Sequence, residues 1–99
     1  MYKRQPSDAF DLSVLRRQTD LTRVGDKDSG IVEMSWEIDV RNAKAEAVVV
    51  DVIETMPPGW QVLSESAPHQ RETARRAVWQ VQVPAGGATR LSYRVRLTT

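Results

Sequence analysis

Strict alternation of apolar and polar side chains is the feature that most constrains the fold of this chain. Over residues 32–41 every even position is apolar and every odd position is charged or serine: Val32, Met34, Trp36, Ile38 and Val40 alternate with Glu33, Ser35, Glu37, Asp39 and Arg41. Successive side chains of a strand point to opposite faces of its sheet. The pattern therefore predicts a strand with one face in a core and the other in water.

Shorter alternating runs recur along the chain, at residues 10–14, 48–52, 60–62, 77–83 and 91–97. In the first run the phase slips before Leu21, which predicts a long strand with a bulge or break between Leu15 and Thr19. No window combines helical apolar spacing with caps, so we expect no helix longer than two turns. Together the runs predict an all-β fold, an immunoglobulin-like antiparallel β-sandwich of about six to seven strands.

Turn residues separate these runs. Segments rich in glycine and proline lie at residues 25–30, 57–59 and 84–87. Such residues adopt turn dihedrals readily and interrupt strand ladders. Residues 64–76 are polar without alternation, and we expect a loop or a short irregular strand there.

Composition narrows the classes of function. The chain has 99 residues, the size of one domain. Fourteen basic and 13 acidic residues give a net charge of +1, which argues against a nucleic-acid or anionic-membrane partner held by net charge. No apolar run approaches the roughly 18 residues of a membrane helix, so direct membrane insertion is not expected. The chain has no cysteine, which excludes disulfides, thiol catalysis and cysteine-ligated metals.

The first residues differ from the rest. Residues 1–5, MYKRQ, resemble the translation of a transposase adapter used in sequencing libraries. We therefore expect a non-native or disordered leader over residues 1–7, with no ladder contacts in residues 1–6. The β-sandwich domain is expected over residues 8–99, as the C-terminal fragment of a longer protein.

Several short motifs occur in the order in which one bacterial family has them. They are AFDL at 9–12, RQTD at 17–20, IDVRNAK at 38–44, PGW at 58–60, VPAGG at 83–87 and LSYRV at 91–95. Over residues 8–99 the chain resembles the C-terminal part of the family labelled domain of unknown function 4139, similar to the mucoidy-inhibitor-A-like proteins. The resemblance implies an exported protein of the periplasm or cell envelope, with an upstream domain in the same polypeptide. It implies no catalytic, cofactor-binding or metal-binding residues.

His69 is the only histidine, and we expect it to be exposed and without a ligand. A metal site would need Glu65 and Glu72, the nearby carboxylates, but nothing in the sequence fixes their geometry. A nucleophilic triad would need Ser64 or Ser66, and neither lies in a Gly-x-Ser-x-Gly elbow. The pair Asp26 and Asp28 resembles part of a calcium loop but lacks the later glutamate at EF-hand spacing, so we expect an ordinary hairpin turn.

Three acidic residues, Glu33, Glu37 and Asp39, share one strand face. Glu33 and Glu37 lie about 13 Å apart along a strand, too far for a hydrolase acid–base pair. Glu37 and Asp39, about 7 Å apart, leave that pairing open, although a solvated outer face is the preferred interpretation.

Basic residues form a stripe at Arg90, Arg94 and Arg96 and a second group at Arg75 and Arg76. No aromatic residues are interleaved with the stripe, so a nucleic-acid stacking surface is not predicted. We expect these arginines to pair with acidic residues of a neighbouring strand.

The three tryptophans are predicted to differ in burial. Trp36 and Trp79 stand in the middle of apolar strand faces and are predicted to be core residues. Trp60 follows Pro57, Pro58 and Gly59, so its ring is predicted to cover one end of the sandwich.

The sequence predicts no catalytic, cofactor or metal site. We expect a non-catalytic β-sandwich module that gives structure or protein contacts in a larger bacterial cell-envelope protein. Its expected partners are the upstream domain and another envelope protein, with no nucleic acid. The alternative is a carbohydrate- or ligand-binding accessory module of an exported enzyme, which an exposed cluster of two or more aromatic rings would favour.

Overall fold

The computed structural model describes residues 2–4, 12–25 and 30–98, and these contain strands but no helix. The strands are β1 (Tyr2–Arg4), β2 (Leu12–Val24), β3 (Ile31–Asn42), β4 (Val48–Thr55), β5 (Gln61–Glu65), β6 (His69–Thr73), β7 (Arg76–Val83) and β8 (Ala88–Thr98). The prediction that no helix exceeds two turns is confirmed for the described residues.

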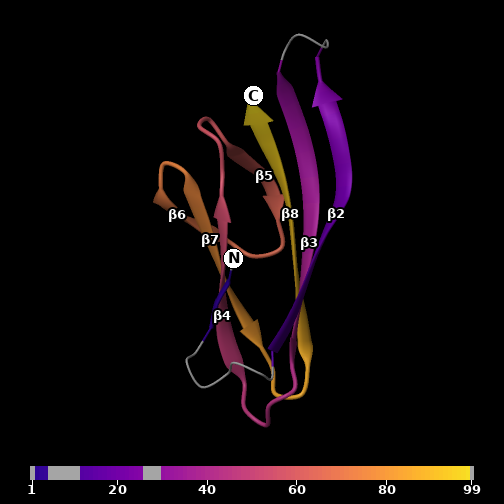
Figure 1. The fold of residues 1–99 in the computed structure, drawn as a ribbon, viewed down its shortest axis with the longest axis vertical. Helices are drawn as coiled ribbons and strands as arrows, with labels where there is room; N and C mark the ends of the chain where they lie inside the picture. Colours follow the sequence, from indigo (N-terminus) through magenta and orange to yellow (C-terminus); the bar gives the residue numbers. More distant parts are fainter. Residues whose placement is uncertain (1, 5–11, 26–29, 99) are drawn as a thin grey trace.

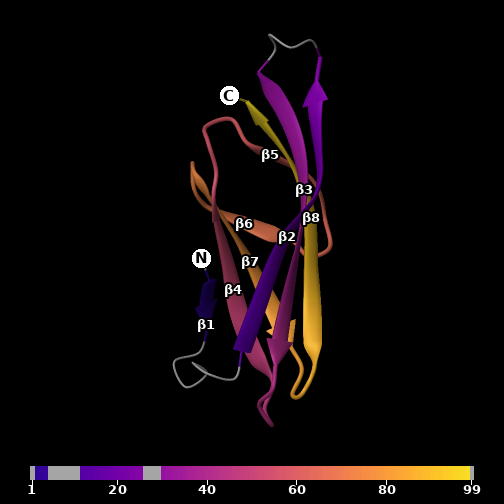
Figure 2. The ribbon, with the colours of Figure 1, turned by 45° about the vertical axis from the view of Figure 1, so that its right-hand side comes forward.

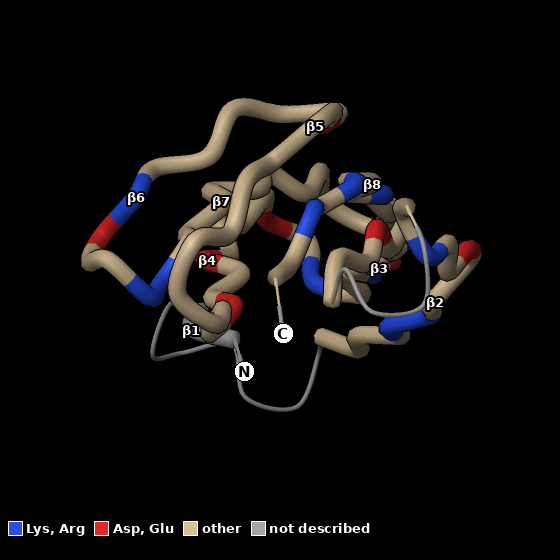
Figure 3. Tube along the Cα trace, turned by 90° about the horizontal axis from the view of Figure 1, so that it is seen from above, with Lys and Arg blue, Asp and Glu red and all other residues tan. Residues whose placement is uncertain are grey.

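The strands form two four-stranded antiparallel sheets (Figure 1). One sheet has the order β1-β4-β7-β6, and the other has the order β2-β3-β8-β5. Figure 3, which looks along the long axis, shows the two sheets as separate layers, with β5 at one side, where the chain crosses from β4 to β5 and back to β6. The predicted all-β antiparallel sandwich is confirmed.

The core lies between the inner faces of the two sheets. Alternate residues of each strand supply it: Ile38 and Val40 from β3, Val48, Val50 and Val52 from β4, Ala77, Trp79, Val81 and Val83 from β7, and Leu91, Tyr93, Val95 and Leu97 from β8. Full burial stabilises the fold by roughly 1.5–3 kcal/mol for each large aliphatic side chain. The alternation in the sequence therefore corresponds to the inner and outer faces of these strands.

The hairpin of β2 and β3 extends beyond the rest of the sandwich at one end (Figures 1 and 2). Its length contributes to an elongated domain of 51 × 25 × 20 Å. Along β3, Ile38 and Val40 are fully buried, whereas Val32, Met34 and Trp36 are only partly buried. The apolar face of β3 is therefore only half covered by the described part of the opposite sheet.

A bulge interrupts β2, as predicted. The register with β3 shifts between Gln18 and Asp20, which leaves Thr19 as the extra residue. The hairpin expected at residues 25–30 is confirmed by the pairing of Val24 with Ile31, while Asp26 and Asp28 lie outside the described residues. A bulge inserts one residue and reverses which face later side chains point to. This explains why the apolar phase slips before Leu21.

The predicted burial of β2 is wrong in part. The alternating run at residues 10–14 predicts that Leu12 and Val14 lie on the inward side of a half-buried strand, but the Val14 side chain is exposed, and Leu12 is only partly buried. β2 is an end strand, paired on one side only among the described strands. An end strand has fewer neighbours to cover its apolar side chains.

Two segments without a sequence signal also form strands. Within residues 64–76 the polar stretch contains the end of β5 and all of β6. At the N-terminus, Tyr2, Lys3 and Arg4 pair with Val52, Asp51 and Val50 of β4. The expectation of no ladder contacts in residues 1–6 is therefore wrong for these three residues, while residues 1, 5 and 6 lie outside the described part.

The tryptophans are buried differently from the prediction. Trp79 is a core residue, as predicted. Trp36 is only partly buried, because it lies where β3 begins to extend beyond the opposite sheet. Trp60 does not merely cover an end: it is 1% exposed and belongs to the core, and its Nε1 donates to the carbonyl oxygen of Ala74 at 2.9 Å.

Asn42 joins two loops at the opposite end of the sandwich. Its side chain is buried, and its Nδ2 donates to the carbonyl oxygens of Glu46 at 2.7 Å and Pro84 at 3.2 Å. Its backbone N–H donates to the carbonyl oxygen of Gly87 at 2.8 Å. A Cβ on Gly87 would lie 2.8 Å from Cγ of Pro84, so a larger residue there would push the turn apart.

Candidate functional site

Alternating charges cover the outer face of the β2-β3-β8-β5 sheet. We name the following residues the outer charge ladder: Arg17, Asp20, Glu33, Glu37, Asp39, Arg90, Arg94 and Arg96. Figure 3 shows basic and acidic positions next to one another along β2, β3 and β8. The predicted cross-strand pairing of the arginine stripe with an acidic strand is confirmed by these contacts.

Glu33 and Asp39, both on β3, each pair with arginines of β8. Glu33 accepts hydrogen bonds from Arg96 at 2.7 Å and from Arg94 at 3.2 Å. Asp39 accepts from Nε of Arg90 at 2.7 Å. Hydrogen bonds from Arg96 and Arg94 hold the pKa of Glu33 below its usual value, and Arg90 does the same for the pKa of Asp39. Both carboxylates are therefore committed to ion pairs.

The ladder ends at β2 with two opposite and half-exposed charges. Asp20 accepts a hydrogen bond from Arg94 at 2.8 Å, which lowers the pKa of Asp20. Arg17 donates to Glu37. The side chains of Arg17 and Asp20 are nevertheless 55% and 52% exposed. They stand on either side of the bulge at Thr19.

A second cluster lies between the two sheets. Arg16 of β2 donates from Nε and Nη2 to the carboxylate of Glu54 of β4, at 3.1 and 3.0 Å. The Arg16 guanidinium also lies 3.7 Å from the centroid of the Trp36 ring. Beside this pair, Tyr93 is buried, and burial raises the pKa of its phenol. We name Arg16, Trp36, Glu54 and Tyr93 the inter-sheet cluster.

The inter-sheet cluster was not predicted from the sequence, although the sequence carries a signal for it. Arg16 shares the inward parity of Leu12 and Val14, and Glu54 shares that of Val48, Val50 and Val52. Two opposite charges at inward positions of separate strands indicate a pair across a core, because an unpaired buried charge is costly.

His69 lies within a third cluster rather than in an exposed loop. Its Nδ1 is 2.8 Å from Oε2 of Glu65, which also accepts a hydrogen bond from Nε1 of Trp79 at 3.0 Å. Its ring is 5.7 Å from the Trp60 ring and 5.8 Å from the Trp79 ring, centroid to centroid. The prediction of an exposed histidine is therefore wrong, because the segment around it folds as β6 against β7.

The structure does not assemble a triad or a metal site around His69 from the described residues. Ser64 pairs opposite the outward Arg94, whereas Glu65, the partner of His69, pairs opposite the inward Tyr93. Ser66 instead accepts a hydrogen bond on Oγ from the backbone N–H of Ser92. Among the described residues no three histidine, aspartate or glutamate side chains are close enough to share a metal ion.

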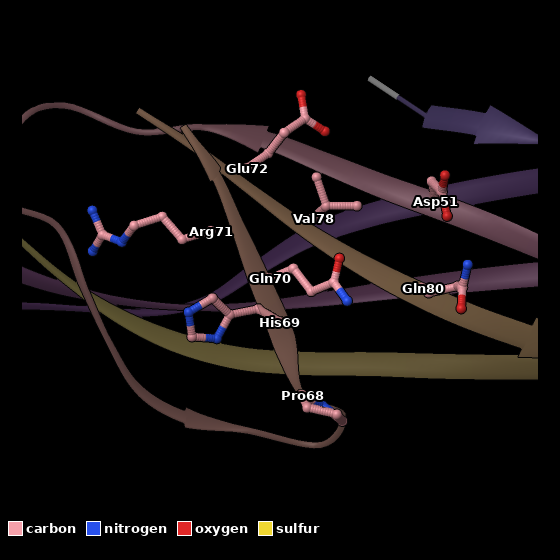
Figure 4. Close-up of a pocket in the computed structure, with 8 residues that line it drawn as sticks. All are labelled: Asp51, Pro68, His69, Gln70, Arg71, Glu72, Val78 and Gln80. Carbon is pink, nitrogen blue, oxygen red and sulfur yellow. The ribbon is translucent and has the colours of Figure 1, made fainter. Parts of the chain in front are cut away.

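A polar hollow lies on the outer face of the other sheet (Figure 4). Its volume is about 530 Å³, and its lining includes Asp51 of β4, Gln70 of β6 and Gln80 of β7. Asp51 and Gln80 lie opposite one another in the β4–β7 ladder. The hollow offers hydrogen-bonding groups to a polar ligand, but the residues that line it include no aromatic ring other than that of His69.

Exposed apolar side chains gather on β2. Leu15 and Leu21 are 60% and 58% exposed, and Val14 is also exposed. Among the described residues the other large apolar side chain with such exposure is Leu63 of β5. Both β2 and β5 are end strands of the same sheet, so these side chains lie near its two edges.

Comparison of the chain with protein-family models, curated proteins and solved structures found no match. Within the described residues, no helix of the length and apolarity needed to cross a membrane occurs.

Proposed function

We propose that this domain is a non-catalytic β-sandwich module that provides structure and protein contacts in a larger bacterial cell-envelope protein. The proposal includes the origin implied by the sequence motifs, in the C-terminal part of the family labelled domain of unknown function 4139. One observation carries it. Three of the four exposed large apolar side chains of the described residues lie on a single end strand, β2: Val14, Leu15 and Leu21.

An exposed end strand is a common surface for protein contacts. Its backbone groups can pair with a further strand, and its side chains supply specificity. β2 is 13 residues long, longer than most strands of globular domains. Such a length offers a partner many backbone hydrogen bonds.

The side chains that could take part in chemistry are engaged in contacts within the fold, which supports a structural role. His69 is engaged with Glu65, Arg16 with Glu54, and Glu33 with two arginines. Each of these pairs joins different strands, so each contributes to the sandwich itself.

The polar hollow favours the alternative, a carbohydrate- or ligand-binding accessory module. Asp51, Gln70 and Gln80 would supply its hydrogen bonds. A sugar ring also needs an apolar face to stack on, which aromatic side chains usually provide. Of the described tryptophans, Trp60 and Trp79 are buried and Trp36 is covered by Arg16. This contrast leads us to prefer protein contacts.

Photocrosslinking in bacterial cells tests the proposal. A photoreactive benzoylphenylalanine replaces Leu15 on β2 in one variant and Gln80 in the hollow in a matched control. We expect protein adducts from position 15, identified by mass spectrometry, and none from position 80. Adducts absent from position 15, together with saturable binding of a soluble glycan that Gln80→Ala abolishes, would favour the alternative instead.

A further inference from the structure

We propose that the partner of β2 is β2 of a second copy of this chain, paired antiparallel across a two-fold axis at the bulge. This inference deepens the proposed function by naming the occupant of the edge, and it rests on that function. It follows from the position of the bulge, the phase of the side chains and the charges of β2.

The bulge in β2 decides which residues of two copies can face each other. In a two-fold antiparallel pair, residues that face each other must share a side of the sheet. Before the bulge, Arg16 and Gln18 lie on the inner side, opposite Ile38 and Trp36. After the bulge, Leu21 lies on the inner side, opposite Met34. The bulge thus changes the parity of the inner residues.

With a two-fold axis at the bulge, inner residues of one copy face inner residues of the other, and outer residues face outer residues, both before and after the bulge. With Gln18 opposite Thr19 of the second copy, Arg16 faces Leu21 of the second copy, and both are inner residues. Arg17 then faces Asp20 of the second copy, and both are outer residues. A bulge normally disrupts pairing along a strand edge. Here the bulge of each copy lies against the bulge of the other, so pairing continues on both sides.

The charges on the outer side of β2 also complement those of a second copy. The outer charge ladder ends at Arg17 and Asp20, each about half exposed. The two-fold axis places each of them opposite the other, which forms two Arg17–Asp20 pairs between the copies. The ladders of the two sheets then continue with alternating sign, from Arg94 and Asp20 of one copy to Arg17 and Glu37 of the other.

Charge also selects the register. The neighbouring in-phase register, with Thr19 opposite Asp20 of the second copy, would place Arg16 opposite Arg23 of the second copy. Like charges directly opposite in a sheet are destabilising. That register also separates Arg17 from Asp20 of the second copy. The first register is therefore the favoured one, and it places Leu15 opposite Thr22 of the second copy.

Sedimentation equilibrium with charge-reversed variants tests the pairing. Arg17→Asp gives each copy two acidic groups at the axis, and Asp20→Arg gives each copy two basic groups. Either variant alone should dissociate at least about tenfold more readily than the natural chain, because like charges would oppose one another. An equimolar mixture of the two should regain dimers, because both opposed pairs become complementary. Arg41→Asp, an exposed change elsewhere on the same sheet, should leave the dimer intact.

Cysteine crosslinking tests the register. The chain has no cysteine of its own, so any disulfide reports only the introduced pair. Mixed Leu15→Cys and Thr22→Cys variants should form a disulfide-linked dimer on mild oxidation, and mixed Leu15→Cys and Val24→Cys variants should not. Circular dichroism of each variant confirms that it is folded.

A natural chain that sediments as a monomer up to about 1 mM, or a mixture of folded variants that stays monomeric, would overturn the inference. Its failure can be told apart from failure of the proposed function. A monomer in solution that still crosslinks from position 15 to a different protein overturns self-pairing alone. A monomer without any adduct overturns both.

Discussion

Arg16 of β2 forms a two-point ion pair with Glu54 of β4, and so joins the two sheets of the sandwich. The Glu54 side chain is 11% exposed, and the Arg16 guanidinium also covers the face of Trp36. A planar guanidinium suits both contacts, since it binds a carboxylate at two points and stacks on a ring. Arg16 therefore connects the carboxylate of one sheet with the tryptophan ring of the other.

Loss of this pair should destabilise the fold. Arg16→Ala leaves the Glu54 carboxylate mostly buried without its partner, so we expect the free energy of unfolding to fall by about 2 kcal/mol. Arg41→Ala, at an exposed position, should change it by less than about 0.5 kcal/mol. Urea denaturation measures both. Equal stability of the two variants would show that the Arg16–Glu54 pair contributes nothing net.

Tyr93 beside this pair makes stability depend on alkaline pH. Burial, together with the nearby Glu54 carboxylate, raises the pKa of Tyr93 in the folded state, whereas an unfolded tyrosine titrates near pH 10. The folded state therefore holds the proton more tightly. Stability should be complete below about pH 10 and fall as the pH rises further. In Tyr93→Phe this fall should be smaller, as measured by urea denaturation at each pH. Phenolate absorbance from Tyr93 in a chain with native circular dichroism near pH 10 would contradict the prediction.

The outer charge ladder gives the opposite dependence in acid. Hydrogen bonds from arginines lower the pKa values of Glu33, Asp39 and Asp20, and unfolded carboxyl groups titrate near pH 4. The ladder therefore contributes its full stability above about pH 4 and loses it as the pH falls through the lowered values. Glu33→Gln should flatten the acid limb of the stability profile, and high salt should do so for the natural chain because these ion pairs lie on the outer, solvent-facing side of the sheet. If neither Glu33→Gln nor high salt changed the loss of stability in acid, that loss would come from other titrating groups.

His69 should contribute to stability through its contacts with two tryptophan rings and Glu65. We expect His69→Ala to lower the free energy of unfolding by about 1–2 kcal/mol, because it removes a partly buried ring and a hydrogen bond. Glu72→Ala removes only an exposed ion pair with Arg76 and should cost less than about 0.5 kcal/mol. Urea denaturation at neutral pH compares them. Equal values would mean that the His69 ring is effectively solvated.

The sequence predicted the sandwich because alternation is a local signal. Ile38 and Val40 are buried, and Asp39 between them pairs with Arg90, as the alternation in that run requires. The same pattern wrongly predicted that Trp36 is a core residue. Its burial depends on the extent of the opposite sheet, which other strands determine and β3 does not. For residues 64–76 the sequence left a loop or a short irregular strand open, because four of the five residues of β6 are exposed and no period of two remains.

The features of the β2 edge, unpaired among the described strands, could be predicted less well than the fold. The phase slip before Leu21 predicted a bulge or break between Leu15 and Thr19, and the bulge lies at Thr19, the end of that range. That Arg17 and Asp20 end a ladder of charges depends on which strands are neighbours, and β3 pairs with β8, some 50 residues away in the chain. Such long-range pairing has no local signature. Arg16 and Glu54 were missed for a different reason, since their inward parity was visible but charged residues were assigned to the outer faces.

The three tryptophans give the sharpest test of the core. Trp60 and Trp79 are almost fully buried, so truncation of either to alanine should cost about 3–5 kcal/mol. A domain of this size has a total stability of roughly 5–10 kcal/mol, so Trp60→Ala and Trp79→Ala should each remove about half of it. Trp36 is only partly buried, and Trp36→Ala should cost about 1–2 kcal/mol and leave a folded domain. In the natural chain, acrylamide should quench mainly the fluorescence of Trp36, and Trp36→Phe should therefore remove most of the quenchable signal. If Trp60→Ala were instead as mild as Trp36→Ala, Trp60 would cover an end of the sandwich rather than fill its core.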